Sequence, residues 1–379
     1  MKCQVLVVGG GPAGSTAARL LAEKGIETVL IEKNLSFNKP CGGGIPSAGL
    51  KEFFILDKIQ KEVKFNTVTK VKIVPPFSEP IEVSLKNGEI LIFNRYNFDS
   101  FLRKLSELQG AKVIEGELTN IEKVNNKIKS TVKDKKGKVF QINSDYLIAA
   151  DGVNSKVCTL IGTPKPDYYW TVSLHIPINS RPKDTCEFWF GNSHASFFYS
   201  WVFPGTDYLS VGTGSEDIRK LKVLIETFIK KRFTMTLNSF TLRAYKIPRW
   251  RKRKFFKNNI LFCGDALGTV MPVSFEGIYY SMKSAQFASE AIIQKDLKLY
   301  EKLWNDNFLM QFTLMKKFQD FMFGNDERMD RWLNIHRDPA IQELAMALWL
   351  RKENGTKLIP LYLKAFGSFI SRIAPFKIK

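Results

Sequence analysis

Three glycines near the start of the chain have the spacing that a bound pyrophosphate requires. Gly9, Gly11 and Gly14 follow an apolar run at residues 4–8 and precede a helix pattern of small residues. The first glycine permits a tight turn, the second lets the backbone approach a pyrophosphate, and the third lets the helix pack on the sheet. The N-terminus of that helix presents unpaired N–H groups to an anion. We therefore predict a dinucleotide-binding site here.

An acidic residue follows the next apolar run. Residues 29–31 are Val, Leu and Ile, and Glu32 comes directly after them. At this position a carboxylate accepts hydrogen bonds from a ribose 2′-hydroxyl and disfavours a 2′-phosphate. Strand, glycines, helix, strand and acid in this order predict the site far more strongly than the glycines alone.

Three later segments extend this pattern. Arg95 stands at the entry to a helix pattern, Asp151 ends an apolar run, and Asp265 ends another run before Gly277 opens a further helix pattern. In this order the features resemble FAD-binding flavoproteins of the aromatic-hydroxylase type. The resemblance implies that Asp265 contacts the ribityl or pyrophosphate part of FAD. It also implies that the helix after Gly277 points its positive N-terminus at the flavin ring.

Two further motifs indicate a family. Residues 39–44 read Lys-Pro-Cys-Gly-Gly-Gly, and residues 199–204 read Tyr-Ser-Trp-Val-Phe-Pro, followed by Gly212 and Gly214. Together they resemble the geranylgeranyl reductase family, in particular the archaeal enzymes that saturate the isoprenoid chains of ether lipids. The resemblance covers about residues 1–295, and beyond about residue 300 the sequence does not discriminate between members.

The glycine pattern and the resemblance together define the candidate site residues. The predicted FAD contacts are Gly9, Gly11, Ala13, Gly14, Glu32, Lys33, Cys41, Gly42, Gly44, Arg95, Leu118, Asp265, Gly277 and Ile278. The predicted substrate contacts are Tyr199, Trp201, Phe203 and Pro204. By this resemblance Arg95 would meet the phosphates or the ribose, Leu118 would meet the adenine through its backbone, and Cys41 would lie near the reactive ring.

The resemblance implies the reduction of an isolated carbon–carbon double bond. A hydride from reduced FAD would reach one carbon and a proton the other. Positive charge then develops at the substituted carbon, and an aromatic face stabilises it by up to ~2 kcal/mol when desolvated. Tyr199, Trp201 and Phe203 share one face of a strand, so they line either a substrate channel or the core of the sheet. Cys41, the candidate catalytic residue, is either the proton donor or a small residue that fits a tight loop.

Composition restricts the class of protein. The chain has 379 residues, of which 44% are hydrophobic and 25% charged, which is typical of an ordered globular protein with two or three structural units. No apolar run reaches the ~18 residues of a membrane span, and the first strand pattern leaves no room for a leader. Five scattered cysteines and three histidines show no metal-ligand spacing, so we expect no metal site. We expect a cytoplasmic protein.

The formal net charge of +20 predicts attraction to phosphates. No nucleic-acid module is visible, so we expect no nucleic-acid partner. Residues 249–257 form the densest basic and aromatic run, and residues 358–376 mix basic with aromatic side chains. These segments either bind anionic lipid on the inner face of the cell membrane, at about 1 kcal/mol per basic residue, or are a solvated loop and a packed helix.

These signals predict an α/β fold. A Rossmann-like parallel sheet would bind FAD in discontinuous segments, beside an antiparallel β-rich substrate domain and a helical C-terminal region. The expected FAD-binding domain comprises residues 1–66, 88–163 and 253–296, the β-rich substrate domain comprises residues 67–87 and 164–252, and the helical region comprises residues 297–379.

We therefore expect an FAD-dependent oxidoreductase acting on CH–CH groups, which saturates geranylgeranyl chains of archaeal ether-lipid precursors. One alternative is an FAD-dependent hydroxylase or halogenase of the same fold, which the Pro-Cys-Gly loop disfavours. Others are a flavin electron carrier without catalytic activity, and a prenyl reductase acting on a quinone tail or on geranylgeranyl diphosphate. The sequence shows no second complete nucleotide fingerprint, so the electron donor stays open between NADPH and a ferredoxin-like protein.

Overall fold

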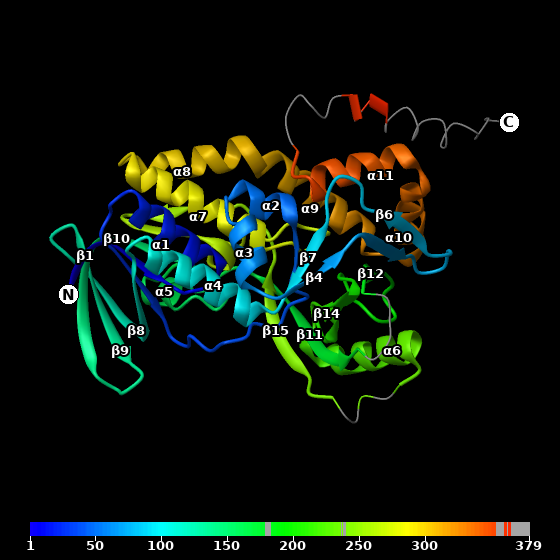
Figure 1. The fold of residues 1–379 in the computed structure, drawn as a ribbon, viewed down its shortest axis with the longest axis horizontal. Helices are drawn as coiled ribbons and strands as arrows, with labels where there is room; N and C mark the ends of the chain where they lie inside the picture. Colours follow the sequence, from blue (N-terminus) through cyan, green and yellow to red (C-terminus); the bar gives the residue numbers. More distant parts are fainter. Residues whose placement is uncertain (179–182, 236, 238–239, 354–359, 362, 365–379) are drawn as a thin grey trace. The chain divides into compact units, whose positions relative to one another are not determined.

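The computed structural model describes the chain except for residues 179–182, 236, 238–239, 354–359, 362 and 365–379 (Figure 1). The chain divides into two compact units, each built from three stretches of sequence. The first unit consists of Met1–Lys39, Arg95–Tyr169 and Lys246–Gln319. The second consists of Pro40–Asn94, Trp170–Tyr245 and Asp320–Lys379. Most of the predicted basic and aromatic segment at residues 358–376 lies outside the described residues.

The strands of the first unit's sheet follow the order β1-β2-β8-β9-β10-β17-β16, and β1 also pairs with β10. They are β1 (Lys2–Val8), β2 (Thr28–Glu32), β8 (Lys112–Val124), β9 (Lys127–Asp134), β10 (Val139–Ala149), β16 (Phe256–Lys257) and β17 (Ile260–Phe262). β1 runs parallel to β2 and β10, and β10 runs parallel to β17. β2 and β17 are continuous apolar runs up to their ends, as expected for strands covered on both faces. The predicted parallel sheet is confirmed.

Helices cover the sheet of the first unit. They are α1 (Pro12–Glu23), α4 (Arg95–Leu108), α5 (Lys156–Leu160), α7 (Ile278–Ile293) and α8 (Leu297–Trp304), followed by a π-helical turn at Asn305–Leu309 and by α9 (Met310–Met322). α1 begins with a proline at its first position, where no N–H is needed. Its buried side chains are mostly small, so α1 packs closely on α4 and α7.

The main sheet of the second unit has the strand order β15-β11-β14-β13-β12-β5-β6. Its strands are β5 (Lys70–Val74), β6 (Ile81–Ser84), β11 (Tyr168–Pro177), β12 (Thr185–Trp189), β13 (Ser200–Pro204), β14 (Tyr208–Ser215) and β15 (Arg243–Pro248). Val202 and Val211 pack on Phe228 of α6 (Leu221–Phe233) in one apolar cluster. Because side chains alternate along a strand, Trp201 and Phe203 of β13 point to the opposite face from Val202 and α6.

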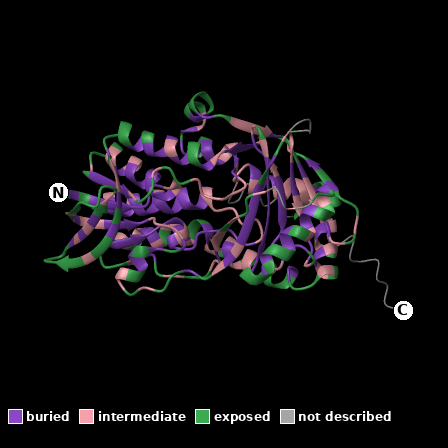
Figure 2. Cartoon of the chain, turned by 90° about the horizontal axis from the view of Figure 1, so that it is seen from below, coloured by how far each residue is buried: buried purple, intermediate pink, exposed green. Residues whose placement is uncertain are grey.

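Shorter elements complete the second unit. A small sheet has the order β3-β7-β4, formed by Gly44–Pro46, Ile90–Phe93 and Phe65–Val68. The helices are α2 (Ser47–Glu52), α3 (Leu56–Glu62), α10 (Asp326–Asn334) and α11 (Pro339–Ala345), and α11 continues into a π-helical turn at Met346–Leu350. Figure 2 shows buried residues gathered along the strands and exposed residues on the outer turns of helices. Among the described residues, no helix combines the length and apolarity needed to cross a bilayer.

Candidate functional site

The glycine turn after β1 has two glycines that the fold itself requires and one that it does not. Gly9 has a φ of +105°, and a Cβ atom there would lie 2.4 Å from the carbonyl oxygen of Ala150. A Cβ atom at Gly14 would lie 1.8 Å from the carbonyl oxygen of Gly9. A Cβ atom at Gly11 would meet nothing within 4 Å. The space at Gly11 therefore suits the close approach of a group outside the chain, as a pyrophosphate requires.

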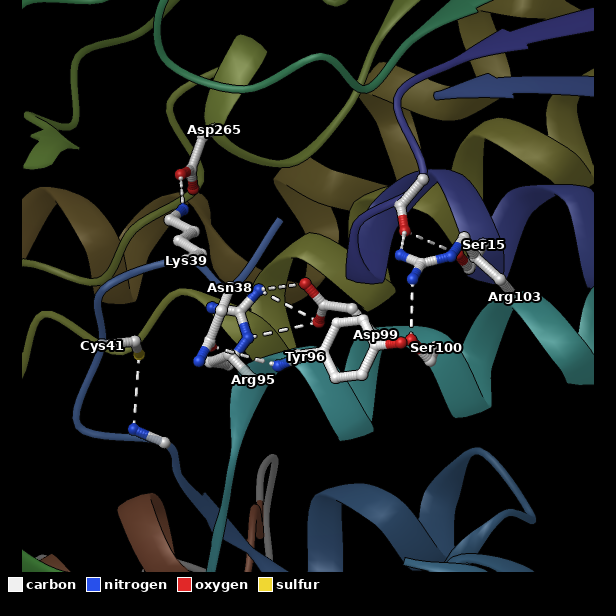
Figure 3. A network of polar contacts seen from close by, with 12 residues as sticks. Ser15, Asn38, Lys39, Cys41, Arg95, Tyr96, Asp99, Ser100, Arg103 and Asp265 are labelled. Carbon is white, nitrogen blue, oxygen red and sulfur yellow. Dashed lines mark hydrogen bonds and ion pairs between the residues drawn. The ribbon is translucent and has the colours of Figure 1, made fainter. Parts of the chain in front are cut away.

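Polar side chains hold this turn in place. The Glu32 carboxylate accepts the Gly10 N–H at 2.7 Å and the Asn34 N–H at 3.0 Å. Arg103 donates to the Gly10 carbonyl at 3.0 Å, and Ser15 donates to the same carbonyl at 3.1 Å (Figure 3). A carboxylate has about four lone-pair sites, so Glu32 keeps capacity for the predicted ribose hydroxyl. Arg103 was not predicted, since a lone arginine inside a helix belongs to no motif.

Arg95 opens α4 and forms a buried ion pair. Its Nε and Nη2 donate to the Asp99 carboxylate one turn later, with the shortest distance 2.9 Å between Nη2 and Oδ2 (Figure 3). Both residues are buried. A guanidinium has five N–H donors in all. The pair with Asp99 therefore fixes the direction of Arg95 and remains compatible with the predicted contact to a phosphate or ribose.

Asp265 lies in the turn after β17 and forms an ion pair with Lys39. The distance between Lys39 Nζ and Asp265 Oδ2 is 2.6 Å (Figure 3). A Cβ atom at Gly277 would lie 3.8 Å from Asp265 Oδ1, so the carboxylate stands beside the start of α7. No side-chain hydrogen bond caps α7, which leaves N–H groups at the positive end of that helix. Lys39 was not predicted as a site residue, although it directly precedes the Pro-Cys-Gly motif.

The remaining predicted cofactor contacts in the first unit have varied surroundings. Ala13 is buried. A Cβ atom built at Gly264 would lie 3.0 Å from the Cβ atom of Ala13, so the start of α1 lies beside the turn that contains Asp265. Ile278 is the first residue of α7 and is half-buried. Leu118 is buried on β8 opposite Val132, while Lys33 is exposed.

In the second unit, the Pro-Cys-Gly loop lies on the aromatic strand β13. The Cys41 carbonyl accepts a hydrogen bond from Ser210 Oγ at 3.3 Å, and the same Oγ accepts one from Trp201 Nε1 at 3.4 Å. The Cys41 thiol sulfur accepts the Gly43 N–H at 3.4 Å (Figure 3). The two motifs that indicated the family, 160 residues apart, are thus joined through Ser210, which was not predicted.

The predicted substrate residues belong to a larger aromatic cluster. The ring of Phe188 lies 5.1 Å from the rings of both Tyr199 and Phe203, and 6.4 Å from that of Trp349 (centroid distances). β12 pairs with β13 so that Phe188 stands opposite Trp201, which places the Phe188 ring among these side chains. Pro204 is buried at the end of the strand, and its carbonyl accepts a hydrogen bond from Asn66. Phe188 and Trp349 carried no sequence signal for this cluster.

Two titratable rings stack on the neighbouring strands β11 and β14 of the same sheet. The rings of His175 and Tyr208 are 3.9 Å apart and nearly parallel. Burial raises the pKa of Tyr208, and the charges of Asp207 and Cys41 raise it further. Burial and the charge of Arg243 lower the pKa of His175. Both rings are therefore uncharged at neutral pH, although His175 is exposed and Tyr208 only half-buried.

Comparisons with known proteins identify the domain and its relatives. Residues 2–294 match the family model described as FAD binding domain. The chloroplastic geranylgeranyl diphosphate reductase of Arabidopsis thaliana is 30% identical over 97% of this chain and 85% of its own. The digeranylgeranylglycerophospholipid reductase of Methanocaldococcus jannaschii is 28% identical over 86% of this chain and 88% of its own.

Solved structures show the same relationship. A geranylgeranyl bacteriochlorophyll reductase-like protein from Thermoplasma acidophilum has a TM-score of 0.79 at 25% identity, covering 99% of this chain and 97% of its own. A flavin-dependent brominase reaches a TM-score of 0.78 at 16% identity, over 98% of this chain and 99% of its own, which supports the shared fold alone. With the FAD binding domain matched over residues 2–294 and a geranylgeranyl diphosphate reductase 30% identical over 97% of the chain, the chain belongs to the geranylgeranyl reductase family of FAD-dependent oxidoreductases.

Proposed function

We propose that this protein saturates the carbon–carbon double bonds of geranylgeranyl chains in archaeal ether-lipid precursors. The observation that carries the proposal is the contact of the Cys41 loop with two neighbouring strands of the second unit, β13 through Phe203 and β14 through Ser210. It packs the loop that carries the Cys41 thiol against a cluster of aromatic rings, and an aromatic face stabilises the positive charge of a protonated alkene. We further propose that the first unit holds FAD and the second unit the isoprenoid chain.

The residues of the first unit fit FAD. The open space at Gly11 and the N-terminus of α7 supply the approach and the positive field that the nucleotide and the reduced ring need. Glu32, Arg95 and Asp265 supply the polar contacts. When bound and reduced, FAD supplies a hydride. The cofactor contacts at Cys41, Gly42 and Gly44 of the second unit remain predictions.

The residues of the second unit would handle the proton. Cys41 donates the proton from its thiol, and the Gly43 N–H that points at the sulfur stabilises the resulting thiolate. Ser210 fixes the Cys41 backbone and the Trp201 indole together. Tyr199, Trp201 and Phe188 exclude water and present their faces to the chain. Tyr208 stays uncharged, since its raised pKa keeps the phenol protonated.

We also propose that the run of residues 249–257 contacts anionic lipid. Lys252 and Lys254 of this run are exposed. Trp250 and Arg253 line a small pocket together with Thr269 and Asn305. The Thr269 Oγ1 and Asn305 Oδ1 atoms are buried and make no hydrogen bond among the described residues, and the pocket has room for about one water molecule. The support for a lipid contact is therefore the positive charge of the exposed lysines, which attracts a lipid-phosphate surface.

Anaerobic turnover tests the proposed reaction. The purified yellow protein would be reduced chemically and mixed, in parallel arms, with a geranylgeranyl ether lipid phosphate, geranylgeranyl diphosphate and a prenylated quinone. Mass spectrometry should show a gain of two hydrogens per double bond, fastest with the ether lipid. Faster saturation of geranylgeranyl diphosphate or of the prenylated quinone would identify that compound as the substrate instead. Oxygen or halide incorporation in air, without saturation, would establish a hydroxylase or halogenase instead. Repeating the assay with NADPH or reduced ferredoxin identifies the electron donor.

Vesicle flotation tests the lipid contact separately. The wild-type protein should float with anionic vesicles at low salt and less at high salt, because salt screens exposed charges. The variant Lys252→Glu/Lys254→Glu should float less. The matched control Lys222→Glu/Lys230→Glu reverses two exposed charges on α6 of the second unit and should float like the wild type. Equal flotation of both variants would contradict the contact.

A further inference from the structure

The ion pair between Lys39 and Asp265 joins residues that are 226 positions apart, both within the first unit. Their side chains are 22% and 11% exposed, so the pair is shielded from water on most sides. It stands beside Gly277, at the uncapped start of α7.

The charge of Asp265 creates a problem that Lys39 resolves. The family resemblance assigns Asp265 to the ribityl or pyrophosphate part of FAD, and the pyrophosphate is itself doubly negative. A carboxylate without a cation would repel it, and more strongly in a shielded site than in water. An ammonium group at 2.6 Å cancels that charge. An ammonium also has three N–H donors, so a bond to Asp265 is compatible with a second bond to an oxygen of the cofactor.

We propose that Lys39 is a cofactor-binding residue. Its ammonium group stays paired with Asp265 when FAD binds and donates to a phosphate or ribityl oxygen of the cofactor. The pair thus presents a neutral-to-positive surface to an anionic ligand. The alternative is that Lys39 pairs with Asp265 only in the absence of FAD, and that the cofactor must displace the lysine in order to bind. The two hypotheses predict opposite changes in FAD affinity when the lysine is removed, and neither depends on the proposed substrate.

The test measures FAD affinity of the apoprotein by flavin fluorescence over a range of salt concentrations. Lys39→Met should weaken FAD binding about tenfold or more, equivalent to ~1.4 kcal/mol, and should flatten the dependence of affinity on salt. Lys39→Arg should bind FAD nearly as well as the wild type. Lys39→Met/Asp265→Asn should bind FAD more tightly than Lys39→Met alone, because the repelling carboxylate is gone.

Two controls keep the result interpretable. Lys24→Met removes one exposed positive charge at the far end of α1 and should leave FAD affinity unchanged. Thermal unfolding of each apoprotein checks folding. If Lys39→Met fails to fold, the uncharged pair Lys39→Gln/Asp265→Asn replaces it, and its FAD affinity should likewise be below that of the wild type. FAD binding by Lys39→Met, or by that replacement, as tight as or tighter than the wild type would overturn the proposal.

Discussion

The ring of Phe203 lies directly against Gly42. A Cβ atom at residue 42 would lie 2.4 Å from Cδ2 and 2.7 Å from Cε2 of that ring, closer than real side chains approach. The ring is itself packed edge-on against Phe188 at a centroid distance of 5.1 Å, so it has little room to turn away. The Cys41 loop therefore reaches the aromatic strand only because residue 42 has no side chain.

Replacing Gly42 by alanine should push the loop off β13. Overpacking of this kind costs about 1–3 kcal/mol of stability, and turnover should fall because Cys41 moves with the loop. Urea unfolding and anaerobic single-turnover assays measure the two effects. The double variant Gly42→Ala/Phe203→Leu should recover part of the stability, since leucine vacates the space of the ring.

Gly324 provides the matched control for this substitution. A Cβ atom there would meet nothing closer than 3.7 Å, so Gly324→Ala should leave stability and turnover unchanged. If Gly42→Ala behaved like Gly324→Ala, the contact with Phe203 would have no consequence for the site.

Gly11 and Gly14 should respond differently to alanine. Gly14→Ala would bring a Cβ atom to 1.8 Å from the Gly9 carbonyl oxygen, so the apoprotein should be severely destabilised or fail to fold. Gly11→Ala should cost the apoprotein less than about 1 kcal/mol, the cost of alanine at a helix N-cap, yet FAD affinity should fall strongly. Thermal unfolding of the apoproteins and FAD titration separate the two effects. Equal FAD affinity in Gly11→Ala would mean that the cofactor does not approach this turn.

The sequence predicted the local parts of the fold well. The order of strand, glycine turn, helix and acid at β1, α1 and Glu32 depends on neighbours in sequence, so a single pattern contains it. The parallel sheet follows from the continuous apolar runs. Pairings between distant segments leave no such pattern. β12 pairs in parallel with β5, about a hundred residues earlier, and the sequence of neither strand indicates this pairing.

The candidate site divides in the same way. Cys41 and Trp201 were predicted from two motifs, and the structure joins them through Ser210, a serine with no distinguishing sequence context. Phe188 and Trp349 join the aromatic cluster through tertiary packing alone. The pair of Lys39 and Asp265 was within reach, since both residues belong to motifs, but the pairing itself depends on folding.

His194 should make stability depend on acid. Its Nδ1 lies 2.8 Å from Oγ of Ser200, the first residue of β13, and burial lowers the pKa of this histidine to about 4 from 6.5. Between those values the unfolded chain binds a proton that the folded chain does not, so stability should decrease as pH falls from about 6.5 to about 4. The loss should reach at most about 3 kcal/mol. Urea unfolding over this range measures it.

The variant His194→Gln tests the assignment, because glutamine can replace the hydrogen bond and does not titrate. Its stability should vary less steeply with pH than that of the wild type. A smaller slope should persist, since burial also lowers the pKa values of His175 and His336. Identical slopes in the variant and the wild type would assign the acid sensitivity to other groups.

Replacing Cys41 should separate proton transfer from cofactor binding. If its thiol donates the proton, Cys41→Ala should keep FAD bound but slow saturation of the alkene by about 100-fold or more, the usual contribution of a general acid. Ser210→Ala keeps the thiol but removes the 3.3 Å hydrogen bond that holds the Cys41 backbone carbonyl. The turnover of Ser210→Ala should therefore lie between those of Cys41→Ala and the wild type. The measurement is the anaerobic reoxidation of chemically reduced flavin by the prenyl substrate, because that half-reaction contains the proton transfer and excludes the electron donor. Wild-type turnover in Cys41→Ala would leave this thiol no chemical role, and the loop would then serve only to pack against Phe203.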